Sequence, residues 1–308
     1  MARKGILLES VMLKTYKAIA FVLFFIPALS RAVDLQPNDV VAPTPDKTFV
    51  MLSYFGTENR TFYKNGTTVS TPSLQNPVLE SNSIILRTAR SYTVLGMPAI
   101  SFIQIPYTKL ESSGSLSNLS GASGVGDITF ATALWPYANR ETRTYLGLAG
   151  YLTVPVGNYS NNQVFNLGEN RYRLDLQLGF QTPIVGNLDG MIAFDTRWFG
   201  ANTSCAALCG LQQNSTLNQK PLSTLQLGPI YKINQTFTVG ASYFYVSGGS
   251  TTINDIAQNN DIQTQRFLLS LQAYTDFGRF SLQYGRDMET VNGYAQSRVL
   301  ALRYMRSF

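Results

Sequence analysis

The stretch RYRLDLQLGFQ, residues 171–181, alternates without a break between two kinds of side chain. One set of alternate positions is polar or small: Arg171, Arg173, Asp175, Gln177, Gly179 and Gln181. The other set is apolar: Tyr172, Leu174, Leu176, Leu178 and Phe180. Because successive side chains of a β-strand point to opposite faces, this period of two predicts a strand with one charged face and one apolar face.

The same alternation recurs along the chain, and no segment after residue 33 has a convincing helical period. We predict twelve strands, at about 48–59, 80–95, 100–112, 124–137, 144–154, 170–182, 190–199, 222–233, 237–247, 261–274, 279–289 and 296–308. Tight connections such as NRET (139–142) alternate with long polar ones such as GGSTTINDIAQNN (248–260). Short turns at one end and long loops at the other are typical of outer-membrane barrels.

The predicted fold class is therefore all-β: a transmembrane antiparallel β-barrel of about 12 strands, at residues 48–308. In a bilayer every backbone polar group needs a partner within the protein, so the sheet has to close on itself. An even number of strands places both chain termini on the periplasmic side.

The first 32 residues predict a secretory signal peptide. Four basic residues precede the apolar run AIAFVLFFIPAL (18–29), and Ser30-Arg31-Ala32 supplies small residues for cleavage after Ala32. The apolar run is shorter than the roughly 20 residues that a spanning helix needs. An uncleaved N-terminal anchor is the alternative.

Removal of residues 1–32 also removes most of the excess positive charge. The whole chain carries a formal net charge of +6, and residues 33–308 carry 19 basic and 17 acidic side chains. The charge balance therefore gives no support for a nucleic-acid partner. Residues 33–47 contain three prolines and cannot pair as a strand along their length. This N-terminal segment either enters the barrel as a plug or lies in the periplasm.

The chain has no histidine. Histidine is the commonest general base and the commonest metal ligand, and barrel hydrolases use it to activate serine or water. We therefore predict no enzymatic activity, no metal site and no cofactor. Cys205 and Cys209 lie in a polar stretch and, outside the cytoplasm, either form a disulfide or remain free thiols.

The charged face of each strand is predicted to face the lumen, because an arginine facing lipid at the bilayer midplane costs about 2–4 kcal/mol. This reasoning places eight candidate residues inside the barrel: Arg171, Arg173, Asp175, Asp195, Arg197, Arg266, Arg279 and Asp287. They either form a constriction of fixed charges that selects what passes, or pair with one another to fill a narrow interior.

Aromatic residues give a further indication of an outer-membrane barrel. Seven tyrosines fall near predicted strand ends, as in aromatic girdles: Tyr137, Tyr145, Tyr151, Tyr231, Tyr274, Tyr284 and Tyr304. The last strand ends in Phe308, which looks like the assembly signal of bacterial outer-membrane proteins. The expected partners are therefore outer-membrane lipid and the assembly machinery.

Several stretches resemble the outer-membrane channel family of the meta-pathway of phenol degradation. They are VDLQPNDVVAPTPDKTFVMLSYFGTENRTFYKNGTTVS (33–70), YTVLGMPAISFIQIPY (92–107), GVGDITFATALWPYANRETRTYLGLAGYLTVPVGNY (124–159), NLGENRYRLDLQLGF (166–180), YGRDMETVNG (284–293) and the final strand. The cysteine-containing loop is not part of this pattern. The resemblance implies a monomeric channel for passive uptake of small hydrophobic or aromatic compounds. The alternative is a sealed structural or adhesive barrel that acts through its extracellular loops.

Overall fold

The computed structural model describes residues 34–71 and 74–308. The predicted signal peptide, residues 1–32, lies outside the described residues. Within the described residues, no helix is long and apolar enough to cross a membrane.

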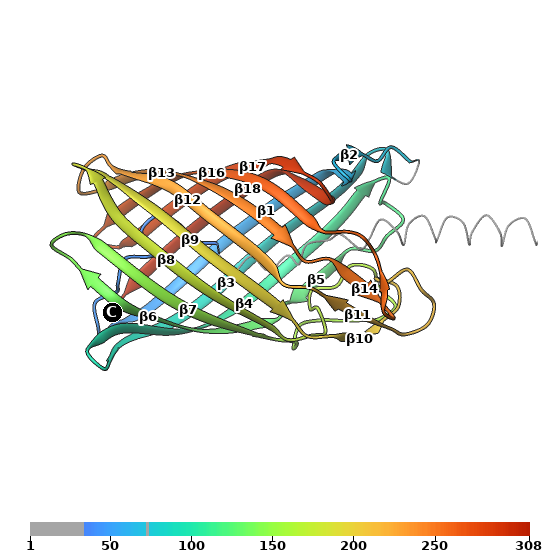
Figure 1. Cartoon of the computed structure of the whole chain (residues 1–308), viewed down its shortest axis with the longest axis horizontal. Coiled ribbons are helices and arrows are strands. Elements are labelled where there is room, and N and C mark those ends of the chain that lie inside the picture. The colour runs from blue at the N-terminus through green and yellow to red at the C-terminus, as the bar shows by residue number, and fades with distance from the viewer. Residues whose placement is uncertain (1–33, 72–73) are drawn as a thin grey trace, which may run out of the picture.

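Twelve long antiparallel strands form a closed barrel (Figure 1). They are β1 (Thr48–Lys64), β3 (Pro77–Val94), β4 (Met97–Gly114), β6 (Ile128–Asn139), β7 (Thr144–Val154), β8 (Arg173–Val185), β9 (Leu188–Phe199), β12 (Leu222–Lys232), β13 (Phe237–Gly248), β16 (Ile262–Thr275), β17 (Gly278–Thr290) and β18 (Gly293–Ser307). The barrel closes because β18 pairs with β1, from Phe49 opposite Ser307 to Tyr63 opposite Gly293. The predicted twelve-stranded antiparallel barrel is confirmed.

The two ends of the barrel differ in their connections. At one end, which we call the turn end, short turns join β3 to β4, β6 to β7, β8 to β9, β12 to β13 and β16 to β17. At the other, the loop end, the connections are long except for the two residues between β17 and β18. The C-terminus lies at the turn end, where Phe308 exchanges backbone hydrogen bonds with Thr48 (Figure 1).

The alternation that predicts β8 is visible in its burial. Leu174 and Leu176 are 45% and 51% exposed on the outer face, while Arg173 and Asp175 are 2% and 1% exposed on the inner face. Exposed apolar side chains and buried polar ones mark a sheet whose outer face meets lipid. The charged face of β8 points into the barrel.

Short strands and an apolar cluster cover the loop end. The strands β10 (Asn202–Cys205), β11 (Ser215–Gln219), β14 (Thr251–Ile253) and β15 (Ile256–Ala257) form a small sheet, β2 (Thr67–Thr68) pairs with β1, and β5 (Ala122–Val125) pairs with β4. A disulfide joins Cys205, at the end of β10, to Cys209 in the connection between β10 and β11. The apolar cluster consists of Phe62, Leu74, Leu79, Leu110, Leu116, Phe165 and Tyr294. It gathers residues from three of the loop-end connections and from the strands β1, β3, β4 and β18.

Two expectations need correction. The predicted strand 124–137 is interrupted between β5 and β6. At this interruption Gly124 has a φ of +145°, and the Asp127 carboxylate accepts hydrogen bonds from the backbone of the connection between β7 and β8. Of the predicted girdle, Tyr145 and Tyr151 are only 5% and 6% exposed and face the interior, and Tyr274 also faces it, where its hydroxyl accepts a hydrogen bond from Asn38. Tyrosine favours strands on either face, so its presence near a strand end does not fix its direction.

Candidate functional site

The interior of the barrel holds two cavities that meet at the N-terminal segment. The loop-end cavity has a volume of about 260 Å³ and the turn-end cavity a volume of about 770 Å³. Asp34 and Gln36 line the loop-end cavity, residues 38–44 line the turn-end cavity, and Arg87 and Arg303 line both. Residues 34–44 therefore lie within the barrel, at the junction of its two open spaces.

Side chains of the barrel wall bind the backbone of this segment. Gln226 exchanges two hydrogen bonds with the backbone of Leu35 (3.1 and 2.7 Å), Gln272 donates to the Pro37 carbonyl (2.7 Å), and Trp135 donates to the Val40 carbonyl (2.7 Å). A segment that cannot join a sheet still needs partners for its buried backbone groups. Glutamine and tryptophan side chains of the lumen supply them.

Asp39 is the main charged contact of the segment. Its carboxylate accepts hydrogen bonds from Arg279 at 2.8 Å and from Arg303 at 2.7 Å. Burial alone would raise the pKa of Asp39, but the charges of Arg303 and Arg279 outweigh it and lower that pKa to about 2. The carboxylate is therefore ionised at any physiological pH and ties the segment to β17 and β18.

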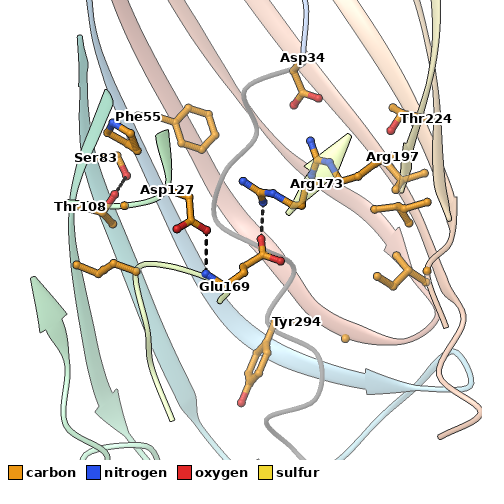
Figure 2. Close-up of a pocket in the computed structure, with 18 of the residues that line it drawn as sticks. Asp34, Phe55, Ser83, Thr108, Asp127, Glu169, Arg173, Arg197, Thr224 and Tyr294 are labelled. Atoms are coloured by element: carbon orange, nitrogen blue, oxygen red, sulfur yellow. Dashed lines mark hydrogen bonds and ion pairs between the residues drawn. The ribbon is translucent and has the colours of Figure 1, made fainter. Parts of the chain in front are cut away.

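A second charged cluster lies at the loop-end cavity (Figure 2). Glu169, in the connection between β7 and β8, binds Arg171 at 2.8 Å and also binds Arg173. The Asp127 carboxylate accepts hydrogen bonds from the backbone of Gly157 and Glu169, both at 2.9 Å, which holds this loop inside the barrel. Burial favours a raised pKa for Glu169, yet Arg173 and Arg171 lower it to about 2.

Two further ion pairs follow directly from strand register. Asp175 of β8 lies opposite Arg197 of β9, and their side chains meet at 2.5 Å. Arg266 of β16 lies opposite Asp287 of β17, and their side chains meet at 2.7 Å. Cross-strand neighbours on one face come within contact distance, so opposite charges placed in register pair across the sheet.

The structure brings most of the candidate residues from the sequence together. Those lining the loop-end cavity are Arg171, Arg173, Asp195, Arg197, Arg266 and Asp287. Arg279 lines the turn-end cavity, and Asp175 lies beside Arg197. Arg171 lies just before β8 rather than within it, yet it is only 7% exposed.

Sequence reasoning missed several charged residues of the lumen. Asp34, Asp39, Asp127 and Glu169 lie outside the long strands, where no periodic pattern shows a direction. A signal for Arg303 was present. It falls between Leu302 and Tyr304, which share the outer face, so alternation alone directs Arg303 inward.

The two cavities differ in charge. The loop-end cavity is nearly balanced, with six basic residues (Arg87, Arg171, Arg173, Arg197, Arg266 and Arg303) and five acidic ones (Asp34, Asp127, Glu169, Asp195 and Asp287). The turn-end cavity has seven basic residues (Lys47, Arg87, Arg140, Arg143, Lys232, Arg279 and Arg303) and two acidic ones (Asp39 and Asp189). Aromatic rings also line it: Phe49, Phe102, Trp135, Tyr145, Tyr151 and Tyr274.

Comparison with known proteins identifies a family and solved structures of similar fold. Residues 59–304 match the family model described as "Putative MetA-pathway of phenol degradation". An outer membrane channel from Pseudomonas putida F1 has 27% sequence identity and a TM-score of 0.83, over 89% of this chain and 100% of that one. The β domain of the Bordetella autotransporter BrkA is far less similar, with 10% identity and a TM-score of 0.48 over 85% of this chain and 100% of that one. No curated protein sequence matches the chain.

Proposed function

The chain belongs to the MetA-pathway family of phenol degradation, and from that premise we propose that it is an outer-membrane channel for passive uptake of small hydrophobic or aromatic compounds. The barrel resides in the bacterial outer membrane, as does the similar channel from Pseudomonas putida F1. The observation that carries the proposal is the pair of cavities inside one closed barrel, one towards its loop end and one towards its turn end.

The lining of the cavities suits such a cargo. Aromatic rings in the turn-end cavity, among them Trp135 and Tyr151, offer flat apolar surface to a ring-shaped solute. Its volume of about 770 Å³ lies within the roughly 300–1,000 Å³ of common small-molecule pockets. The eight charged residues taken from the sequence form, in this proposal, the polar lining that a solute passes. No catalytic step is assigned to any of them.

The N-terminal segment acts as the plug of this channel. It lies at the junction of the two cavities, so a solute that travels from one to the other has to pass it. It contains no strand, and polar side chains rather than a continuous ladder hold it in place. Such a segment can move without breaking the barrel wall.

The proposal extends to assembly. We propose a monomer, which the closure of the sheet within one chain supports, since no open sheet edge remains to pair with a second copy. In this proposal its last strand β18, together with Phe308 directly after it, serves as the signal that the assembly machinery recognises.

A sealed barrel acting through its loops is the competing function, and the apolar cluster that covers the loop end favours it. Uptake of labelled toluene by intact cells separates the two. We expect cells that carry the protein to take up toluene faster than cells that lack it, with a rate proportional to concentration, as a passive pore requires. Equal rates in the two strains would contradict the channel and favour the sealed barrel.

A further inference from the structure

The basic side chains that line the turn-end cavity outnumber the acidic side chains that line it, seven to two. Its two carboxylates, Asp39 and Asp189, are each shared by two cations: Asp39 by Arg279 and Arg303, and Asp189 by Arg143 at 3.2 Å and Lys232 at 2.9 Å. Two carboxylates therefore face four cations before the remaining basic residues are counted.

Three further cations of this cavity bind no carboxylate. Within residues 34–71 and 74–308, no ion pair joins Lys47, Arg87 or Arg140 to an acidic group that lines the cavity. Arg140 donates only to the Ala42 carbonyl, at 3.1 Å, and Arg87 donates to Gln104. The net charge of the lining residues is thus strongly positive at neutral pH.

Unused hydrogen-bond donors point to the same conclusion. The Nε atoms of Arg279 and Arg303 are buried and have no hydrogen-bond partner among the described residues. A buried charged donor without an acceptor is costly, so Asp39 only partly compensates these two guanidinium groups. Arg171, Arg173 and Arg266 of the loop-end cavity also each have a buried donor without a partner, so the two cavities differ in net charge: +1 from six basic and five acidic residues at the loop end, and +5 from seven and two at the turn end.

Aromatic surface accompanies this charge. The Arg87 guanidinium lies over the ring of Phe102, 4.1 Å from its centroid, where β3 and β4 meet the cavity. Tyr151 lies edge-on to the same ring. A solute with an aromatic ring and a carboxylate can therefore place its ring against these side chains while its charge meets the unused cations.

Resting on the proposed channel function, we infer that the turn-end cavity is an anion-selective vestibule and that its preferred cargo is a small aromatic carboxylate rather than a neutral aromatic compound. Rings of like charge in a pore select ions of the opposite charge. The excess lies at the turn end, where Lys47 precedes β1 and Arg140 lies in the turn between β6 and β7. An anion that reaches the loop-end cavity is therefore drawn towards the turn end.

Reversal potentials in planar bilayers test this inference directly. Two salts present the same ring with opposite charge: sodium benzoate and benzylammonium chloride. At about 0.1 M salt, where screening extends over about 10 Å, we expect the anion to permeate on the order of tenfold better than the cation in both salts.

Charge reversal at Lys47→Glu and Arg140→Glu should lower this ratio to below about twofold, because it removes four of the five net charges. The Gln variants at the same two positions should give an intermediate ratio. If the substitutions acted only by loosening the N-terminal segment, the Glu variants and the Gln variants would lower the ratio equally. The matched control is Lys109→Glu with Arg286→Glu, which changes the total charge equally at exposed positions that line neither cavity.

Equal permeation of anion and cation, or a preference for the cation, would overturn the inference, and so would a ratio that the Lys47 and Arg140 variants leave unchanged. A barrel that carries no current at all would also overturn it, since a charged cargo has to conduct. Toluene uptake by cells is measured separately. Normal toluene uptake without anion preference therefore refutes only this inference, whereas the absence of both toluene uptake and any ionic current refutes the channel.

Discussion

The substitution Asp39→Asn removes the charge that anchors the N-terminal segment while keeping the shape of the side chain. Asp39 accepts from Arg279 at 2.8 Å and from Arg303 at 2.7 Å, and its side chain is 15% exposed. Removing one partner of a buried ion pair costs about 3–5 kcal/mol, because the remaining charges stay buried without compensation. At about 1.4 kcal/mol per factor of ten, the undocked fraction of the segment should rise between roughly a hundredfold and a few thousandfold.

A reporter cysteine measures this fraction. Val40 is 3% exposed in the docked segment, so a Val40→Cys residue reacts with a maleimide only when the segment leaves its site. When docking is fast relative to labelling, the labelling rate is proportional to the undocked fraction. The rate should therefore rise by the same factor in the Asp39→Asn background, and single-channel recordings should show longer open periods.

Asp46→Asn is the matched control. It is the same substitution in the same segment, but the Asp46 side chain is 84% exposed and lies 3.9 Å from Arg90. An exposed pair contributes little, so the labelling rate should change less than about fivefold. Equal labelling rates in the Asp39→Asn and Asp46→Asn backgrounds would refute the assignment of Asp39 as the anchor of the N-terminal segment.

Three further predictions concern pH, the loop and the wall. Because the pKa of Asp39 is lowered from 3.8 to about 2, docking should be constant from pH 7 to pH 5 and weaken only as the pH falls from about 4 towards 2; faster Val40→Cys labelling already at pH 5 would argue against it. Glu169→Gln leaves Arg171 and Arg173 without their shared carboxylate and should destabilise the barrel by about 3–5 kcal/mol in urea titrations, whereas Glu111→Gln, at an exposed pair, should cost less than about 1 kcal/mol. Leu176→Arg places a charge on the lipid face, where Leu176 is 51% exposed, and should cost about 2–4 kcal/mol of folding free energy in lipid vesicles but far less in detergent.

Period-two alternation predicted the barrel wall well, because successive strand residues face lipid and lumen in turn, and these two surroundings favour apolar and polar side chains respectively. The direction of Arg173 and Asp175 follows from this rule alone. Register then completes the pairs, since Asp175 meets Arg197 only once β8 and β9 are aligned. The sequence shows which faces are charged, but not which charges meet.

The loops and the N-terminal segment could not be predicted in the same way. Asp39 and Glu169 lie in segments without a period. Asp39 binds arginines distant in sequence, such as Arg303, whereas Glu169 binds Arg171 and Arg173, two and four residues away, and no periodic pattern directs its side chain towards them. Prolines in residues 33–47 excluded a strand but left open where the segment lies. Its place in the lumen depends on glutamines such as Gln226 and Gln272 from strands far along the chain.

The most direct test of the channel measures toluene uptake while a disulfide holds the N-terminal segment against the barrel wall. A Cβ built at Gly240 of β13 lies 3.5 Å from the Cβ of Pro37, a separation typical of disulfides, so Pro37→Cys with Gly240→Cys should bond the segment to the wall. In cells that carry this variant, we predict that toluene uptake falls to the rate of cells lacking the protein and returns to the wild-type rate on reduction. The single Pro37→Cys variant should take up toluene at the wild-type rate under both conditions. Uptake that is equally fast with the disulfide closed and open would contradict passage of the cargo past the N-terminal segment.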